Sequence, residues 1–312
     1  MHLLVLGGTR FVGRAVVDAA LSAGHEVTLF NRGRTNPGLY PQLETVIGDR
    51  TADLSALRGR AFDMVVDVAG YEPAVVALSA TAFPSSRYVY VSSVSVYADQ
   101  SVPAVEGAAT LDDDSYGGRK AACEREVRRV HGDRALIARP GLIVGPYDPT
   151  EPFPHWPRRM ARAGRVLAPG DPGDPTQFID VRDLAQWLVG ATAGGLFNVV
   201  TPPLPMADLL EACRTSTPAE LVWVPSDRLL AAGVDPWMGV PLWIGDPACT
   251  AANLVDASRA RAAGLTTRPV AETVADTRAW DVARGGPAAG TDPFPPESEQ
   301  VLLDGGAATR RR

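Results

Sequence analysis

Short apolar runs alternate with amphipathic helical patterns through the first half of the 312-residue chain. The run "LLVLGG" at 3–8 is continuously apolar, as expected for a strand buried on both faces. Helical periodicity over 11–24 and 115–132 predicts two helices, which end at Gly24 and Gly132. Further strands are expected at 25–31, 43–49, 63–70, 87–97 and 134–141.

Alternating strands and helices predict an α/β fold with a doubly wound parallel sheet, the Rossmann fold that binds nucleotides. Residues 1–146 are expected to form the dinucleotide-binding domain, to which 176–201 return as a helix and a strand. Residues 147–283, rich in proline and aromatic side chains at their start, are expected to form mainly a smaller substrate-binding lobe. The Gly- and Pro-rich residues 284–312 are predicted to be a mobile tail.

Composition narrows the possible functions. The hydrophobic content of 46% is ordinary for a globular protein, and the formal charge of −6 argues against general binding to nucleic acid. Three scattered cysteines and four histidines without ligand spacing predict neither a disulfide framework nor a metal site. No apolar run reaches membrane-spanning length and no leader pattern precedes the first strand, so we expect a cytoplasmic protein without a membrane partner.

A glycine-rich turn joins the first strand to the first helix. In "VLGGTRFVG", Gly7, Gly8 and Gly13 leave room for a dinucleotide pyrophosphate to reach backbone N–H groups. The alternative is a tight turn with a purely structural role. The other predicted contacts of this turn are Thr9, Arg10, Phe11 and Val12, with Arg10 standing where a middle glycine is usual.

The end of the second strand predicts which cofactor binds. An NAD site usually has an acidic residue there, whereas this chain has Asn31, Arg32 and Arg34, which suit a 2′-phosphate. NADP(H) is therefore favoured, NAD(H) remains possible, and the arginines could instead be solvated loop charges. Asp49 is expected either to bind the adenine amino group or to cap a helix, with Arg50 beside it.

Lys120 is the only lysine among the 30 Lys and Arg residues, and it follows Tyr116 by one helical turn. An ammonium about 4 Å from a phenol contributes roughly 4 kcal/mol at an effective dielectric of 20, which favours phenolate. The broad guanidinium of arginine cannot easily replace a compact ammonium that reaches between a phenol and ribose hydroxyls. We therefore expect Tyr116 to exchange protons and Lys120 to tune it.

The segments "VSSVSVYA" and "YGGRK" make the chain resemble the short-chain dehydrogenase/reductase superfamily, in its extended form called the NAD-dependent epimerase/dehydratase family. The resemblance covers about residues 1–282. It implies a catalytic set of Ser93, Tyr116 and Lys120, with hydride transferred at the nicotinamide. It also implies that Pro140, Gly141 and Leu142 pack against the nicotinamide and that Ala69 and Gly70 line the cofactor's other side. Val68, Ser92 and Lys120 are further expected contacts of the cofactor.

Three departures weaken a sugar-nucleotide function. Leu142 replaces the family's usual Asn, Thr176 stands where an Arg clamps the diphosphate, and Val94–Ser95 replace the Asp–Glu pair of dehydratases. Candidate substrate contacts are Ser95, Trp156, Arg158 and Arg162, the two arginines being predicted to share a helix face that could equally be solvated.

Three functions follow as hypotheses. The first is an NAD(P)-dependent oxidoreductase that acts on a carbonyl or alcohol of a small organic substrate. The second is an epimerase or dehydratase that oxidises a sugar nucleotide or related substrate transiently. The third is a nucleotide- or RNA-binding protein on the same scaffold, because "GGTRFVG" is similar to the turn of chloroplast RNA-binding members of the superfamily. A homodimer through the helix that carries Tyr116 is possible.

Overall fold

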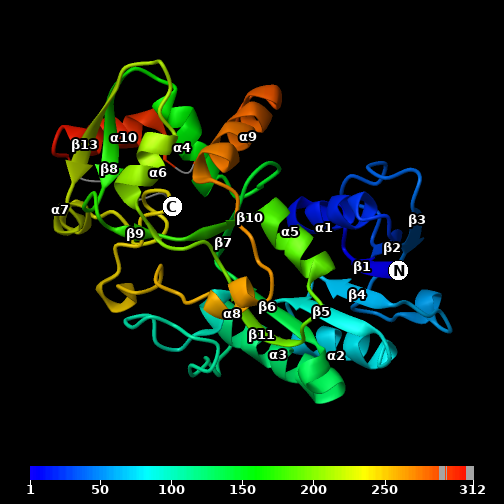
Figure 1. The fold of residues 1–312 in the computed structure, drawn as a ribbon. Coiled ribbons are helices and arrows are strands. Elements are labelled where there is room, and N and C mark those ends of the chain that lie inside the picture. Colours follow the sequence, from blue (N-terminus) through cyan, green and yellow to red (C-terminus); the bar gives the residue numbers. More distant parts are fainter. Residues whose placement is uncertain (288–291, 293, 307–312) are drawn as a thin grey trace.

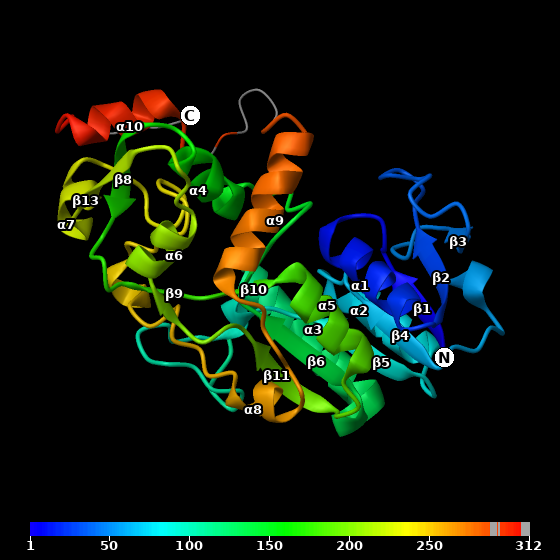
Figure 2. The same cartoon turned by 45° about the horizontal axis from the view of Figure 1, so that its top comes forward.

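The computed structural model describes residues 1–287, 292 and 294–306. Figures 1 and 2 show a larger lobe built on a sheet and a smaller lobe beside it. The sheet has seven strands in the order β11-β6-β5-β4-β1-β2-β3. All its pairings are parallel, and Val5 in β1 lies opposite Leu29 in β2 and Val66 in β4. The strands are β1 (His2–Leu6), β2 (Glu26–Asn31), β3 (Glu44–Ile47), β4 (Met64–Asp67), β5 (Arg87–Val91), β6 (Leu136–Pro140) and β11 (Gly195–Val199).

Helices cover both faces of this sheet. Helices α1 (Phe11–Ser22) and α5 (Val181–Gly190) pack together on one face, and α2 (Pro73–Ala82) and α3 (Tyr116–His131) pack together on the other. The strands are apolar on both sides because each side buries a layer of helix. The predicted doubly wound α/β fold is therefore confirmed.

Helix α3 begins and ends where its sequence predicts. The Ser115 side chain caps its start by accepting a hydrogen bond from the Gly118 N–H at 3.1 Å. Gly132 ends it with a φ of +59°, a conformation that glycine adopts without a steric penalty. These two caps fix where α3 begins and ends, and Tyr116 and Lys120 lie in its first two turns.

The smaller lobe is assembled from short paired strands and helices around its own apolar core. Phe153, Trp156, Phe178 and Leu209 belong to this core. Strand β8 pairs with β13 and β7 with β10 in parallel, whereas β9 and β12 are antiparallel. The strands are β7 (Leu142–Val144), β8 (Gly164–Pro169), β9 (Pro175–Thr176), β10 (Phe178–Asp180), β12 (Leu204–Pro205) and β13 (Ala219–Val224). The helices are α4 (Pro152–Met160), α6 (Met206–Ala212), α7 (Ser226–Ala231), α9 (Val270–Ala283) and α10 (Pro296–Leu303), whereas α8 (Ser258–Ala262) packs against β11 of the larger lobe.

The expected long strand at 87–97 is shorter in the structure. Strand β5 ends at Val91, and a 3-10 turn (Val94–Val96) follows because the Ser93 side chain accepts a hydrogen bond from the Ser95 N–H. Other 3-10 turns lie at Ser55–Leu57, Gly132–Arg134 and Pro247–Cys249.

Part of the predicted mobile tail is folded. Residues 296–303 form α10, and Phe294, Leu302 and Leu303 join the core of the smaller lobe. The buried Glu299 carboxylate accepts hydrogen bonds from the Leu167 N–H at 2.9 Å and from Arg159 at 2.6 Å. Its Gly and Pro content indicated disorder, but its apolar side chains find a core to pack in. Residues 288–291, 293 and 307–312 of the predicted tail lie outside the described residues.

None of the helices in the described part of the chain combines the length and apolarity needed to cross a bilayer.

Candidate active site

The glycine turn has the geometry that a pyrophosphate requires. Gly7 and Gly8 have φ values of +119° and +98°, which side chains on L-residues rarely permit. A Cβ added to Gly13 would lie 2.6 Å from the Gly8 amide nitrogen. The turn, with Thr9, Arg10, Phe11 and Val12, therefore keeps its backbone close to the start of α1, and these residues fit a dinucleotide phosphate.

The residues after β2 surround an exposed acidic group. Asn31 accepts a hydrogen bond from the Gly33 N–H at 2.8 Å and donates to the Gly7 carbonyl at 3.4 Å, so it links β2 to the glycine turn. Arg32 and Arg34 are exposed. Asp49 caps a turn by accepting from Thr51, and hydrogen bonds from Thr51, with a smaller effect of the two arginines, lower the pKa of Asp49. The capping alternative for Asp49 is thus realised, in a turn instead of a helix.

Arg50 does not face this group. Its guanidinium is bound to both carboxylate oxygens of the fully buried Asp67 at 2.6 and 2.7 Å, and to Ser79 at 2.6 Å. Burial would raise the pKa of Asp67, but the Arg50 guanidinium holds it below its usual value. The Arg50 guanidinium thus neutralises a buried carboxylate, and its predicted contact with the cofactor stays a prediction.

Lys120 is buried between two strand ends. The Lys120 side chain extends from α3 towards the ends of β4 and β5. Its Nζ donates to the Gly70 carbonyl, shortly after β4, at 2.8 Å and to the Val91 carbonyl, at the end of β5, at 2.6 Å. The residue is only 2% exposed, and burial lowers the pKa of Lys120 to about 8 against the attraction of Asp67. An ammonium has three N–H groups, so one remains for a ribose hydroxyl.

Tyr116 and Ser93 lie near one another, but the expected effect of Lys120 on Tyr116 is absent from the described structure. Tyr116 is 48% exposed, and both bonds of Lys120 go to backbone carbonyls. Burial of the ring and the neighbouring Tyr71 raise the pKa of Tyr116, and the Ser93 hydroxyl opposes this in part. Tyr116 is therefore a neutral phenol that can donate a proton, where the sequence predicted a bias towards phenolate.

Tyr71 is a site residue that the sequence analysis missed. It follows the "DVAG" segment directly and is 53% exposed, and its ring centroid lies 4.9 Å from Lys120 Nζ. Tyr90 contacts the same ammonium from another direction at 4.7 Å. Two aromatic faces thus stabilise a cation that has little access to water. The signal available in the sequence was a tyrosine directly after the strand predicted at 63–70.

Ser92 and Ser93 have different roles although they are adjacent. Ser92 is buried and donates to Glu124, whose carboxylate also binds the buried Arg139 at 2.6 and 2.9 Å. Ser92 thus links the end of β5 to α3, and its predicted contact with the cofactor stays a prediction. Ser93 instead donates to the Ser95 hydroxyl at 3.0 Å at the border of a cavity.

This inner cavity, of about 370 Å³, lies at the carboxyl end of the sheet. Ser93, Ser95, Gly141 and Leu142 line it on the side of the larger lobe, and Trp237 lines it from the smaller lobe. The predicted contacts Ser93, Ser95, Gly141 and Leu142 are therefore brought together, along with Phe11 from the glycine turn. Val68, Ala69 and Gly70 follow β4, the Val68 side chain lies 3.0 Å from a Cβ placed at Gly7, and Pro140 ends β6.

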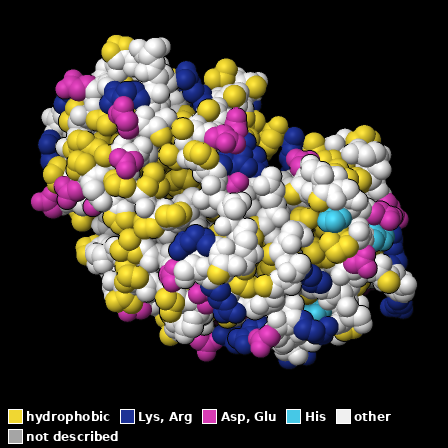
Figure 3. Space-filling model, viewed as in Figure 1, with side chains coloured by type: hydrophobic (Ala, Val, Ile, Leu, Met, Phe, Trp, Pro, Cys, Tyr) yellow, Lys and Arg dark blue, Asp and Glu magenta, His cyan; other side chains and the backbone are white. Residues whose placement is uncertain are grey.

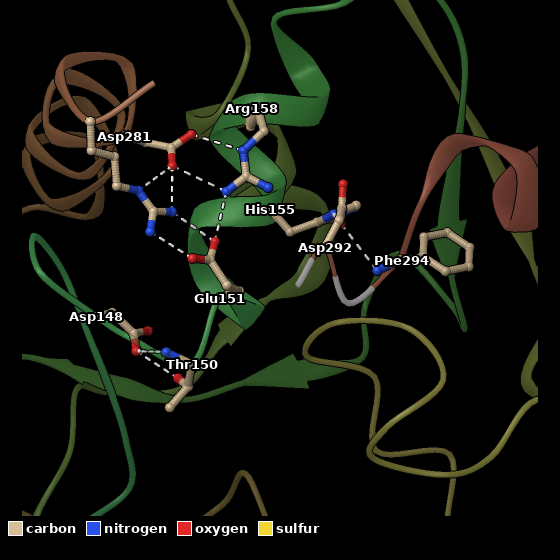
Figure 4. A network of polar contacts seen from close by, with 9 residues as sticks. Asp148, Thr150, Glu151, His155, Arg158, Asp281, Asp292 and Phe294 are labelled. Atoms are coloured by element: carbon tan, nitrogen blue, oxygen red, sulfur yellow. Dashed lines mark hydrogen bonds and ion pairs between the residues drawn. The ribbon is translucent and has the colours of Figure 1, made fainter. Parts of the chain in front are cut away.

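The other three predicted substrate contacts lie elsewhere. Trp156 is fully buried in the core of the smaller lobe and donates to the Pro241 carbonyl at 3.1 Å. Arg158 binds Glu151 and Asp281, each at 2.8 Å, in the buried network of Figure 4, which Arg284 joins. Arg162 is exposed beyond the end of α4, so it does not continue a helix face with Arg158. The proline-rich sequence gave no indication that most side chains of α4 are buried.

Comparison with known proteins identifies the family. The family described as "NAD dependent epimerase/dehydratase family" matches residues 3–82 and 73–195. The chain belongs to this family. The resemblance read from the Ser93 and Tyr116 motifs is confirmed.

Individual relatives in and around this family have diverse names. The chain is 32% identical over 205 residues to chloroplast stem-loop binding protein of 41 kDa b from Arabidopsis thaliana, covering 59% of this chain and 53% of the relative. It thus spans about half the length of that relative. It is also 30% identical over 254 residues to 2-alkyl-3-oxoalkanoate reductase from Stenotrophomonas maltophilia, covering 67% of this chain and 74% of the reductase.

Solved structures share the fold. The structure of UDP-glucuronic acid 4-epimerase from Bacillus cereus in complex with NAD matches with a TM-score of 0.65 at 16% identity. The match covers 91% of this chain and 99% of the epimerase. The Rossmann-type fold with its second lobe is therefore a shared architecture, and at this identity the likeness extends to the fold alone.

Proposed function

We propose that this protein is an NAD(P)-dependent oxidoreductase that transfers hydride between a nicotinamide and a carbonyl or alcohol of a small organic substrate. The observation that carries the proposal is the position of Lys120, buried against the ends of β4 and β5 within one helical turn of Tyr116. Ser93 lies at the same strand end and borders the inner cavity.

Each residue has a separate role in this proposal. Tyr116 donates its phenolic proton to the substrate oxygen during reduction and takes it back during oxidation. Ser93 donates a hydrogen bond to the same oxygen. Lys120 holds the ribose through its remaining N–H, which positions the cofactor. The cofactor, when bound at the glycine turn, supplies or accepts the hydride.

The cofactor we favour is NADP(H). Arg32 and Arg34 are exposed beside the end of β2, and neither forms an ion pair within residues 1–287, 292 and 294–306. Their guanidinium groups are therefore free to bind a 2′-phosphate. Replacing both with alanine should weaken binding of NADPH at least tenfold and leave binding of NADH within about threefold, because only NADPH carries the extra phosphate.

A sugar nucleotide suits the inner cavity poorly. Among the described residues that line this cavity, Asp99 is the only charged one, and none is a Lys, Arg or His. A diphosphate placed there would be desolvated without a cation, which is strongly unfavourable. This charge pattern favours an uncharged carbonyl substrate over the sugar-nucleotide alternative.

The test is net consumption of cofactor. A panel of ketones and aldehydes is incubated with NADPH or NADH, and oxidised cofactor and alcohol product are quantified together. We expect stoichiometric formation of both for at least one uncharged ketone. Interconversion of epimers without net consumption would contradict the proposal and favour the epimerase alternative.

A third arm addresses nucleic acid. On the face shown in Figure 3, Lys and Arg side chains are interspersed with acidic and apolar ones. A salt-dependent shift of RNA in a gel, with no cofactor turnover on the panel, would contradict the oxidoreductase proposal and favour the binding alternative.

A further inference from the structure

A second cavity adjoins the first, and nothing so far assigns a role to it. This outer cavity, of about 450 Å³, lies in the smaller lobe between the ends of β8 and α7 and the loop at 242–250. Asn253 lines both cavities. Thr176 and Thr250 line the outer cavity, and the residues that follow them, Gln177 and Ala251, line the inner one. The two cavities are therefore neighbours along the same wall of the protein.

The outer cavity is predominantly apolar. Met206, Leu230, Leu242, Trp243 and Ile244 line it. The Trp243 indole is held in place by donating to the Ser226 hydroxyl at 3.0 Å, and Met206 and Trp243 are buried. Its walls thus offer rigid apolar surface, which binds hydrocarbon through release of water.

Charge restricts what this cavity accepts. Its charged lining residues are Asp174, Asp227 and Asp246, with no Lys, Arg or His among the described residues that line it. Each carboxylate already accepts a backbone N–H, from Asp171, Arg228 and Ala248 respectively. Asp174 and Asp227 are exposed, so their charges lie at the solvent side. A phosphate or carboxylate would meet only like charge here, whereas a neutral chain meets apolar walls.

We propose that the outer cavity binds the hydrocarbon chain of a neutral ketone whose carbonyl group lies in the inner cavity beside Ser93 and Ser95. The proposal rests on the proposed function, since it takes the reacting end of the substrate from it. During reduction the carbonyl carbon accepts the hydride and its oxygen accepts the Tyr116 proton, so the product is the corresponding secondary alcohol. The chain itself undergoes no chemistry.

The first experiment measures kcat/KM for the series of 2-alkanones from butan-2-one to decan-2-one. Each added CH2 that enters an apolar cavity should raise kcat/KM about threefold to fourfold until the space is filled. Leu230→Trp fills part of the outer cavity and should lower the ratio of kcat/KM for decan-2-one to that for butan-2-one at least tenfold. Leu78→Trp, at a similarly exposed leucine on α2, is the matched control and should retain the ratio of the parent.

The second experiment does not depend on turnover. Cys249 lines the outer cavity and is partly exposed, whereas Cys123 and Cys213 are buried, so iodoacetamide should label the folded protein mainly at Cys249. Decan-2-one or decan-2-ol should slow this labelling at least fivefold, and butan-2-one or UDP should not. Cys249→Ser identifies the labelled site.

The outcomes separate the two proposals. Protection of Cys249 without reduction of any ketone would refute the proposed function and leave the chain-binding cavity intact. Reduction of ketones with no dependence on chain length and no protection would overturn the assignment of the outer cavity and leave the proposed function intact. Protection by UDP at the same concentration would overturn the assignment of a neutral ligand.

Discussion

Lys120 is held by two backbone carbonyls at the ends of neighbouring strands, and this position accounts for its being the only lysine in the chain. A compact ammonium fits between these carbonyls and the rings of Tyr71 and Tyr90. The wider guanidinium fork of an arginine would need more space than a residue with 2% exposure has.

The pKa of Lys120 predicts how activity depends on pH. Burial lowers this pKa to about 8, so the ammonium form in the free protein is lost as the pH rises through about 8. Because only the charged form binds the ribose strongly, kcat/KM should fall above pH 8. A pH profile of kcat/KM from 6 to 10 tests this, and a plateau that extends to pH 9.5 would contradict it.

Asp148 provides a residue-scale prediction about stability. It is fully buried, one carboxylate oxygen accepts two hydrogen bonds from Thr150, and the other has no partner among the described residues (Figure 4). Burial raises the pKa of Asp148 from 3.8 to about 6. The folded protein therefore favours the protonated form, and the associated stability is lost as the pH rises from about 4 to 6.

Asp148→Asn should remove this dependence, because an amide has no proton to lose. Between pH 5 and pH 7.5 the stability of the variant relative to the parent should increase by about 1–2 kcal/mol in urea unfolding. The matched control is Asp53→Asn, because the Asp53 carboxylate accepts the equivalent two hydrogen bonds from Ser55 on the surface. A relative stability of Asp148→Asn that is the same at both pH values would show that Asp148 ionises normally.

At the scale of elements, α3 is anchored to the sheet through a buried ion pair. Glu124 on α3 binds Arg139 on β6 and Ser92 after β5, beneath the turn of helix that carries Lys120. This ion pair fixes the position of α3 along the sheet, and therefore the positions of Lys120 and Tyr116 relative to the strand ends.

Glu124→Ala should therefore destabilise the protein by about 3–5 kcal/mol, since it leaves a buried guanidinium without its partner. Glu126→Ala on the same helix removes a largely exposed contact to Arg129 and should cost less than about 1 kcal/mol. Urea unfolding followed by circular dichroism compares the two. Equal losses would show that the buried pair has no special role.

The elements of the larger lobe were predictable because each has a clear period or an unbroken apolar run. The smaller lobe was predictable only as a region of changed composition. Its strands β8 and β13 pair although Gly164 and Ala219, which lie opposite each other, are far apart in the sequence, and no local pattern encodes such a pairing. The fold of α10 was missed for the same reason, because Phe294 and Leu302 find their partners in distant elements.

The site was predictable where a motif fixes both the residue and the direction of its side chain. Spacing placed Tyr116 and Lys120 on one helix face, and the resemblance to the family's motif singled out Ser93. Spacing did not show which side of a loop Arg50 faces, or that Arg158 meets carboxylates on α9 and before α4. Residue type alone indicated a charge available for binding in both cases, but both charges are neutralised within the fold.

At the scale of the whole molecule, the two lobes contribute different parts of one proposed enzyme. The larger lobe carries the glycine turn, Ser93, Tyr116 and Lys120, and the smaller lobe lies beside the sheet, as Figure 2 shows, and contributes to both cavities. Cofactor chemistry would thus be set by residues at the carboxyl end of the sheet, and substrate choice by side chains of the smaller lobe such as Trp237 and Leu230.

The central claim is that the phenol of Tyr116, one helical turn before the buried Lys120, exchanges the proton that accompanies hydride transfer. Its most direct test is the kcat/KM of Tyr116→Phe for a ketone that the parent reduces, with NADPH affinity measured by fluorescence on the same preparation. We predict a loss of about 10²–10⁴-fold in kcat/KM with NADPH affinity within twofold of the parent. A Tyr116→Phe variant that reduces the ketone within about threefold of the parent rate would contradict the claim.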